Sequence, residues 1–216
     1  LNLKVSRQGD NGTIRIEERL LREDRGIPGL GTLTSDSADL STTQTLTRLS
    51  WENGGLSIAP HFQYQKQQFS DPEGEIGLGV EDNDNDTYQY GLEAVSTQLS
   101  GKHQRWTLAA HLQGEHFLPE DFSSGTEGPA QSRYQGSLTV EDEVALFNER
   151  LLLNPSLRTE HLFNRFGGEE RDLHPVSCKI GLLFRPEERL GFRTSLARAF
   201  RLPNFSELYG DRGGIL

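Results

Sequence analysis

A run of acidic and amide residues at positions 81–86 is the segment whose spacing comes nearest to a metal site. Its three alternate carboxylates have the spacing of the oxygen ligands in calcium loops: Asp82, Asp84 and Asp86. Glu93 stands at the twelfth position, but Thr87 occupies the place where the sharp turn of such a loop requires glycine. Strands, not helices, are expected on both sides. We therefore favour a solvated acidic loop and keep calcium binding as the alternative.

Catalytic motifs are missing from the chain. There is no Gly-x-Ser-x-Gly elbow, no Gly-Lys-Ser or Gly-Lys-Thr phosphate loop and no His-Glu-x-x-His pair, and the six histidines are scattered. Cys178 is the only cysteine, which excludes an internal disulfide and a cysteine-rich zinc site. We expect neither an enzyme nor a bound cofactor.

Composition restricts the class of protein further. The 216 residues carry a net charge of −10, and no basic stripe accompanies the aromatic residues, so nucleic acid is not an expected partner. Mean hydropathy is −0.61, and the longest apolar run, residues 180–184, is far shorter than the roughly 20 residues of a membrane-spanning helix. A transmembrane β-strand shows lipid only every second side chain, so hydropathy leaves that possibility open.

Alternation of apolar and polar residues predicts the elements that carry these side chains. Segment 56–64 divides by parity into an apolar set, Leu56, Ile58, Phe62 and Tyr64, and a polar set, Ser57, His61 and Gln63. The same two-residue period recurs at 106–113, 176–185 and 190–196. The sequence therefore predicts an all-β chain of antiparallel strands, each with one apolar and one polar face.

Connections of two kinds alternate along the chain. Short turns are expected near residues 8–12, 53–54, 100–102, 147–149 and 186–188. Long polar loops are expected near 22–40, 69–86, 118–131 and 165–173, with a fifth beginning near Phe200. This order predicts an up-and-down meander of about ten strands, with short turns at one end and long loops at the other, as in bacterial outer-membrane barrels.

A soluble antiparallel β-sheet domain with a binding or structural role is the alternative, because such sheets also alternate and also have unequal loops. The two readings differ in one respect: the apolar parity forms one continuous surface in a barrel wall but is buried between two sheets in a sandwich. Asp142 shares the apolar parity of its strand. In a barrel it must lie near a rim, where a charge facing lipid costs little.

The end of the chain resembles the TonB-dependent outer-membrane receptors. In that family a barrel strand commonly runs into a Phe-Arg-x-Pro corner followed by a Glu-Leu-Tyr segment. The matching residues are Phe200, Arg201, Pro203, Glu207, Leu208 and Tyr209. Because Pro203 has no N–H, the strand is expected to end near Leu202. Weaker similarities cover residues 24–29 and 133–160.

The resemblance implies part of a transporter in the outer membrane of a Gram-negative bacterium. We expect residues 1–216 to form a single, partial β-barrel domain from the C-terminal part of such a receptor, without a plug domain. Uptake would depend on a TonB-type energising protein that contacts a missing N-terminal part of the parent protein. The wall would contact outer-membrane lipid, and its open strand edges are expected to allow self-association.

The resemblance also implies a ligand at the outer loops, namely an iron-siderophore, another metal chelate or a cobalamin-like nutrient. Guanidinium groups near those loops can bind the carboxylates or catecholates of such a chelate. The candidate residues in or beside the loops are Arg25, Arg165, Arg171, Arg201, Arg212, His116 and Phe166. No spacing selects among them.

Overall fold

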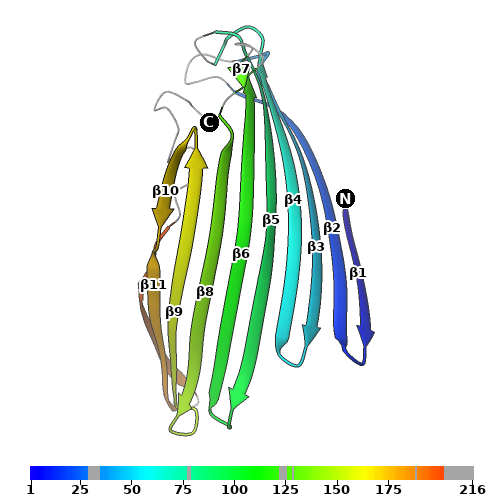
Figure 1. Ribbon diagram of the computed structural model, residues 1–216. Helices are drawn as coiled ribbons and strands as arrows, with labels where there is room; N and C mark the ends of the chain where they lie inside the picture. The colour runs from blue at the N-terminus through cyan, green and yellow to red at the C-terminus, as the bar shows by residue number, and fades with distance from the viewer. Residues whose placement is uncertain (29–34, 77–78, 122–125, 128, 188, 202–216) are drawn as a thin grey trace.

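Twelve strands form one antiparallel sheet in the computed structural model, which describes residues 1–28, 35–76, 79–121, 126–127, 129–187 and 189–201 (Figure 1). The strands are β1 (Asn2–Gly9), β2 (Gly12–Gly26), β3 (Asp39–Asn53), β4 (Leu56–Asp71), β5 (Glu81–Ser100), β6 (Gln104–Asp121), β7 (Thr126–Glu127), β8 (Gln131–Leu146), β9 (Leu151–Phe166), β10 (Glu169–Leu173), β11 (Val176–Glu187) and β12 (Leu190–Arg198). The predicted all-β antiparallel class is confirmed. Among the described residues, no helix has the length and apolar character needed to cross a membrane.

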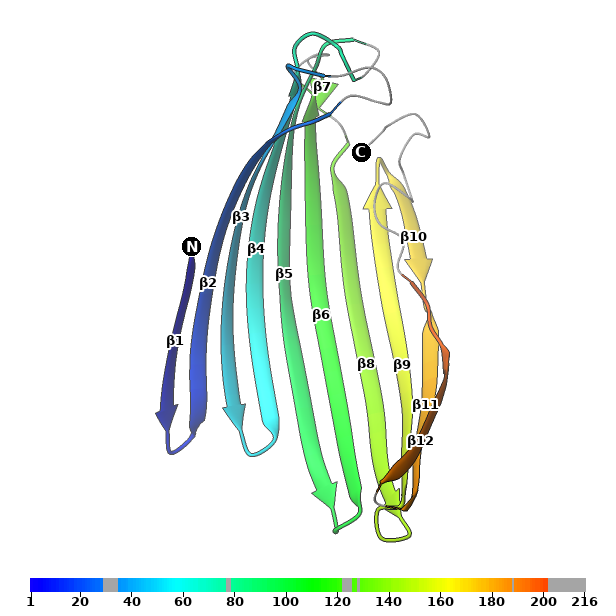
Figure 2. The same cartoon turned by 180° about the vertical axis from the view of Figure 1, so that it is seen from behind.

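Ten of the strands follow one another in chain order across the sheet: β1, β2, β3, β4, β5, β6, β8, β9, β11 and β12. The other two are short, since β7 pairs only with the end of β6 and β10 pairs with β9. β1 and β12 are the outermost strands, and each has one neighbour within the described part of the chain. The sheet is a curved wall with open edges (Figures 1 and 2), which confirms the predicted meander of about ten strands.

Short turns join the hairpins where the sequence predicts them. The β1–β2 connection shows the backbone requirement: Gly12 has φ +111°, and a Cβ at this position would lie 2.2 Å from the Glu52 carbonyl oxygen. Only glycine meets both conditions, because other residues rarely adopt this φ and their Cβ would clash with that oxygen. The turn between β8 and β9 is different, since Phe147, Asn148 and Glu149 all have positive φ although none is glycine.

Each of the four expected long loops between strands is a strand in part, because β2, β4, β6 and β9 all extend into them, and the difference matters most at two of them. Residues 81–86 begin β5 and continue its register with β4, from Asp71↔Glu81 to Lys66↔Asp86. Residues 165–173 contain the end of β9 and all of β10, joined by a two-residue turn at Gly167 and Gly168. Both glycines have positive φ, as the tight hairpin turn requires. The loop predictions are wrong at these positions because high polarity indicates contact with water and not the absence of a strand.

The sheet has two distinct faces. Residues paired directly across antiparallel strands share a face, so Leu92, Leu112 and Gly136 lie on one side and Glu93, His111 and Ser137 on the other. The first face carries the exposed apolar side chains, among them Leu112 at 57% exposure and Leu157 at 54%. The second holds polar side chains, some of which are buried, such as Glu160 at 6% exposure. We call these the convex apolar face and the concave polar face.

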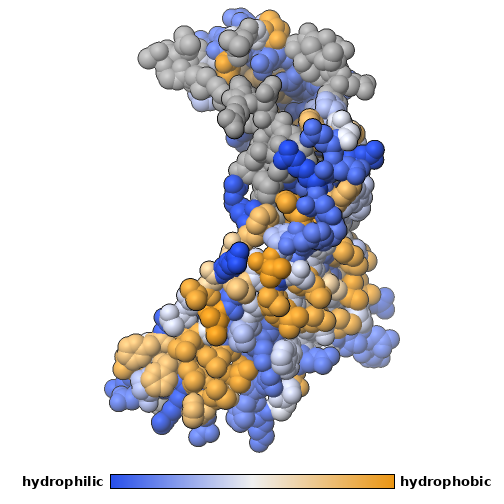
Figure 3. Space-filling model, turned by 60° about the vertical axis from the view of Figure 1, so that its left-hand side comes forward, coloured by the Kyte–Doolittle hydropathy of each residue, from blue (hydrophilic) through white to orange (hydrophobic). Residues whose placement is uncertain are grey.

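The convex apolar face is one continuous surface rather than a buried layer. Ala38, Ala59 and Leu162 are the only buried hydrophobic residues in the described part of the chain. Figure 3 shows hydrophobic residues gathered over the lower part of the molecule and hydrophilic ones above them. This arrangement agrees with the predicted barrel wall, since a sandwich would bury these side chains between two sheets.

Aromatic residues mark two levels on the convex face. Trp106 lies near the short turns, and Tyr88 lies near the loops, in register with His116 on β6. The ten-residue span from Trp106 to His116 corresponds to about 33 Å along the strand, or about 25 Å in height at the usual strand tilt. This height matches the apolar band of outer-membrane barrels. Asp142 pairs with Trp106, so its predicted position near a rim is confirmed.

Candidate functional site

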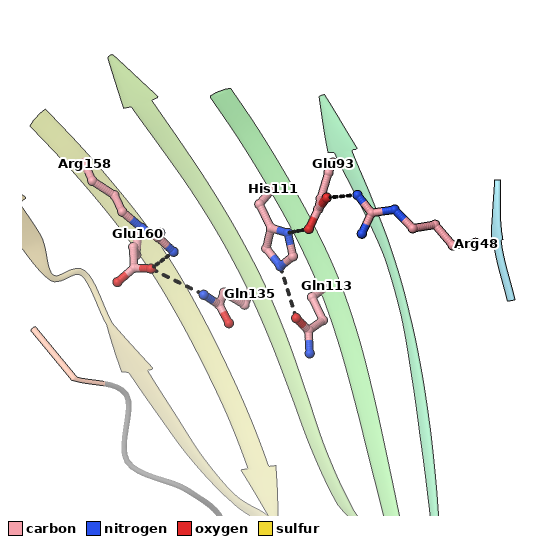
Figure 4. Close-up of polar contacts among 7 residues, drawn as sticks. All are labelled: Arg48, Glu93, His111, Gln113, Gln135, Arg158 and Glu160. Carbon is pink, nitrogen blue, oxygen red and sulfur yellow. Dashed lines mark hydrogen bonds and ion pairs between the residues drawn. The ribbon is translucent and has the colours of Figure 1, made fainter. Parts of the chain in front are cut away.

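A chain of polar contacts crosses the concave face at the middle of the wall (Figure 4). The Arg48 guanidinium Nη2 donates to Glu93 Oε2 at 2.5 Å, and the second oxygen of Glu93 lies 3.9 Å from His111 Nδ1. His111 Nε2 lies 3.0 Å from Gln113 Oε1. These residues come from β3, β5 and β6, and the Arg48–Glu93 contact joins residues 45 positions apart in the sequence.

A second group on the same face is centred on Glu160. Its carboxylate accepts hydrogen bonds from Arg158, two residues away on β9, and from Gln135 Nε2 at 3.3 Å on β8 (Figure 4). Between the two groups lies a shallow hollow whose lining includes Glu93, Ser137 and Arg158. The middle of the concave face therefore offers both signs of charge beside an open space.

The upper part of the concave face contains a more deeply buried contact. Arg133 Nε donates to Asn164 Oδ1 at 2.8 Å, and Asn164 is fully buried. Arg171 on β10 pairs with Asn164 in register, and Phe166 lies on the same face two residues beyond. The structure thus brings two of the predicted ligand residues, Phe166 and Arg171, together with Arg133.

Two other predicted residues lie on the opposite side of the wall. His116 and Arg165 are both in register with Ser132, on the convex side near the loops. His116 Nδ1 lies 2.9 Å from the Ser132 hydroxyl, and its ring stacks on Tyr90. Arg165 contacts Glu170 at 4.0 Å. Sequence proximity to a loop did not distinguish the two faces, because parity decides the face.

The remaining predicted residues are separated from these groups or lie outside the described residues. Arg25 belongs to β2, near the other edge of the wall, and lies 4.0 Å from Glu23. β12 ends at Arg198, before the predicted end near Leu202, and the Phe200 amide donates to the Ser177 hydroxyl at 3.2 Å. Arg201 is the last described residue. Those beyond the described part are Pro203, Glu207, Leu208, Tyr209 and Arg212.

The proposed calcium ligands form a polar row on β5. Asp84 Oδ2 forms an ion pair with Lys66 Nζ, 2.7 Å away. Asp86 Oδ1 accepts a hydrogen bond from the Tyr64 hydroxyl at 2.7 Å. The prediction that these residues lie in a loop is wrong, because they belong to β5. Alternate residues of a strand project in a line along one face instead of converging around an ion. Asp82 is in register with Ser70.

Sequence reasoning missed a carboxylate clamp between two loops. Glu75 Oε2 accepts hydrogen bonds from the Ser35 and Ser37 hydroxyls at 2.7 and 2.8 Å, and from the amides of Asp36 and Ser37 at 2.9 Å each. These donors lower the pKa of Glu75 to about 2, with the Ser37 amide contributing most. Buried Asp71 accepts a hydrogen bond from the Glu75 amide, and this bond orients the clamp. Contact between residues 40 positions apart leaves no local sequence pattern.

A curved antiparallel wall with an apolar convex face, aromatic residues near both ends and a polar concave face defines a segment of a transmembrane β-barrel. The family comparison agrees, since residues 4–215 match the model described as TonB dependent receptor-like, beta-barrel. The chain belongs to this family of outer-membrane proteins of Gram-negative bacteria. The resemblance drawn from residues 200–209 is therefore confirmed at the level of the family.

Solved structures show the same fold. The chain is similar to BauA, the ferric preacinetobactin receptor of Acinetobacter baumannii, with a TM-score of 0.69 and 10% identity over 90% of this chain and 38% of that one. For the FrpB iron transporter of Neisseria meningitidis (F3-3 variant), the TM-score is 0.65 at 13% identity, over 90% and 36%. For the ferric citrate transporter FecA, it is 0.65 at 10%, over 90% and 40%.

The chain spans about two fifths of the length of these structural neighbours. A comparison with curated protein sequences finds no match.

Proposed function

We propose that this chain forms part of the wall of a receptor that takes up an iron-siderophore by a TonB-dependent route. The observation that carries the proposal is the two-faced sheet: lipid-compatible side chains cover the convex face, whereas the concave face keeps charged and amide groups in contact with one another. A wall of this kind encloses a polar interior in a membrane. Membership in the receptor family supports uptake as the task of that interior.

The ligand class follows from the chemistry of the upper concave face. Arg133, Arg171 and Phe166 gather there, and guanidinium and aromatic groups suit anionic or catecholate chelates of iron. The structural neighbours named above are titled as iron, ferric preacinetobactin and ferric citrate proteins, which favours an iron chelate over a cobalamin-like nutrient. The proposed contact residues are Arg171 and Phe166, with Arg133 as a residue that orients the group.

A panel of radiolabelled ligands tests the substrate class. Cells that lack their own receptors for each ligand would express this protein and receive ferric siderophores of the catecholate, hydroxamate and carboxylate types, together with cobalamin. Uptake of a ferric chelate that stops when the TonB-type partner is deleted is the expected result. Uptake of cobalamin alone would favour the other nutrient, and uptake that persists without the partner would contradict the mechanism.

A matched pair of variants tests the proposed face. Arg171→Ala removes a guanidinium from the concave side, whereas Arg165→Ala removes one from the convex side of the same hairpin. We expect only Arg171→Ala to weaken chelate binding by cells, with both variants reaching the outer membrane in equal amount. Equal binding by the two variants would exclude the upper concave face as the contact surface.

The open edges support a second, structural role. β1 and β12 each present unpaired backbone groups on one side within the described residues, and such edges pair with further strands. We propose that they pair with neighbouring strands of a complete barrel wall, or with a second copy when this segment is expressed alone. Light scattering of the isolated segment in detergent tests the second case, where a monodisperse monomer would contradict pairing.

A further inference from the structure

Two histidines and an aspartate meet near the upper edge of the convex face, away from the polar groups of the concave wall. His161 lies on β9, Asp172 on β10, and His174 in the connection between β10 and β11. Their ligand atoms, one from each residue, all lie within 4.8 Å of one another. This group is the only such His, Cys, Asp or Glu cluster among the described residues.

The distances within the group agree with the coordination of a metal ion. His161 Nε2 lies 3.1 Å from Asp172 Oδ1, and His174 Nε2 lies 3.5 Å from Asp172 Oδ2. Two ligands about 2.0–2.1 Å from a tetrahedral zinc ion are separated by about 3.3–3.4 Å. The imidazole rings stand nearly perpendicular, at 87°, with centroids 4.5 Å apart. Perpendicular rings let both nitrogens approach one point without stacking.

The backbone holds the three residues in place. Pro175 follows His174 and restricts His174 to extended conformations. The Pro175 carbonyl oxygen accepts a hydrogen bond from the Glu160 amide at 3.0 Å. That bond fixes the connection against β9, beside His161. Asp172 is fixed independently by its pairing with Phe163. The site is therefore prepared by strand pairing, before any ion is bound.

Space for the rest of a coordination shell is also present. All three side chains are about half exposed. A hollow beside His161 is lined by Leu112, Tyr134 and Gly136, and the absence of a side chain at Gly136 opens it next to the imidazole. An ion held here would keep one or more coordination positions for a further ligand.

We propose that His161, Asp172 and His174 bind a divalent first-row transition-metal ion, with Zn²⁺ as the probe ion. Imidazole nitrogen suits such ions, and one carboxylate with two imidazoles is a common ligand set for them. The ion joins β9 to the point where the pairing strand changes from β10 to β11. This proposal concerns the outer side of the wall and does not depend on which nutrient is transported.

The test uses the protein purified in detergent without a histidine tag and stripped of metal with a chelator. Co²⁺ is titrated while its visible absorption bands are followed, and Zn²⁺ is then added to displace it. We expect one Co²⁺ for each chain, displaced by Zn²⁺. His174→Ala and Asp172→Asn should each weaken binding by at least about tenfold, which is the lower end of the loss seen even for residues that only support a ligand.

Control variants make the test specific. His103→Ala changes an exposed histidine in the β5–β6 turn, and His111→Ala changes one on the concave face, so both should bind Co²⁺ as the unchanged protein does. Heat-modified migration on gels verifies that every variant is folded. Absence of a Co²⁺ spectrum, or equal binding by His174→Ala and the unchanged protein, would overturn the proposal. Loss of binding in His111→Ala alone would place the ion elsewhere and would also overturn it.

Discussion

Arg48 and Glu93 form an ion pair across a strand that belongs to neither of them. Arg48 is on β3 and Glu93 on β5, with β4 between them, and their Nη2 and Oε2 atoms are 2.5 Å apart. Ala59 of β4 pairs with Glu93 in register and is only 2% exposed. A small side chain at this position lets the two long side chains meet above it. The contact therefore depends on all three strands.

The ion pair predicts a measurable coupling. Both side chains are about 40% exposed, so a double-mutant cycle of Arg48→Ala and Glu93→Ala should give a coupling of about 0.5–1 kcal/mol in urea unfolding. In an Ala59→Leu background the coupling should vanish, because the larger side chain occupies the space beneath the bridge. The Arg15–Glu52 pair is the control and should keep its coupling in that background. Unchanged Arg48–Glu93 coupling in Ala59→Leu would contradict this account.

Adjacent residues on β8 should respond oppositely to the same substitution. Leu138 lies on the convex face midway between the aromatic levels, and Ser137 lies on the concave face in register with Glu160. Leu138→Arg should destabilise the folded protein in lipid vesicles by about 2–4 kcal/mol, because it places a charge at the middle of the bilayer. Ser137→Arg should cost less than about 1 kcal/mol, since it enters a polar space that contains carboxylates. Equal losses in the two unfolding curves would mean that the faces are wrongly assigned.

The Glu75 clamp predicts a pH dependence at the loops. The pKa of Glu75 is lowered from its usual 4.5 to about 2 by hydrogen bonds, so its ionised form is favoured in the folded protein. Its contribution is fully present above about pH 4.5 and is lost as the pH falls towards 2. The difference in unfolding midpoint between the unchanged protein and Glu75→Gln should therefore be constant from pH 7 to about 4.5 and shrink below it.

Glu73→Gln, in the same loop, is the matched control for that experiment, because it also removes one carboxylate near the clamp. The difference in unfolding midpoint between Glu73→Gln and the unchanged protein should not shrink in the same way as the pH falls below about 4.5. A difference for Glu75→Gln that stays constant down to pH 2 would show that the clamp does not act through the ionised carboxylate.

The β8–β9 turn predicts a stabilising substitution. Glu149 has φ +66°, in the left-handed region that costs a non-glycine residue about 1 kcal/mol or more. Glu149→Gly should therefore raise the free energy of unfolding by up to about 1 kcal/mol, reduced by the greater freedom of glycine in the unfolded chain. Glu149→Ala removes the same carboxylate but keeps the strain, so it should not stabilise. Equal midpoints for the two variants in urea would rule out backbone relief.

Much of the wall could be predicted from local patterns. Strands such as β4 and β11 follow from two-residue alternation, and the turns at Gly12 and Gly54 follow from residues that tolerate positive φ. The order of short and long connections was enough to predict the meander. Polarity misled the prediction at residues 81–86 and 165–173, because it marks contact with water and not the absence of a strand.

The sequence by itself determined which residues share a face and which family the chain resembles, because both depend on spacing along a few residues. Only the tertiary structure decided which side chains meet. Arg48 reaches Glu93 over Ala59, Glu75 joins two loops, and His161 meets Asp172 because β10 folds back on β9. These contacts depend on strand register and on loop paths. Register is set by pairing along the whole wall, so no single segment of the sequence contains it.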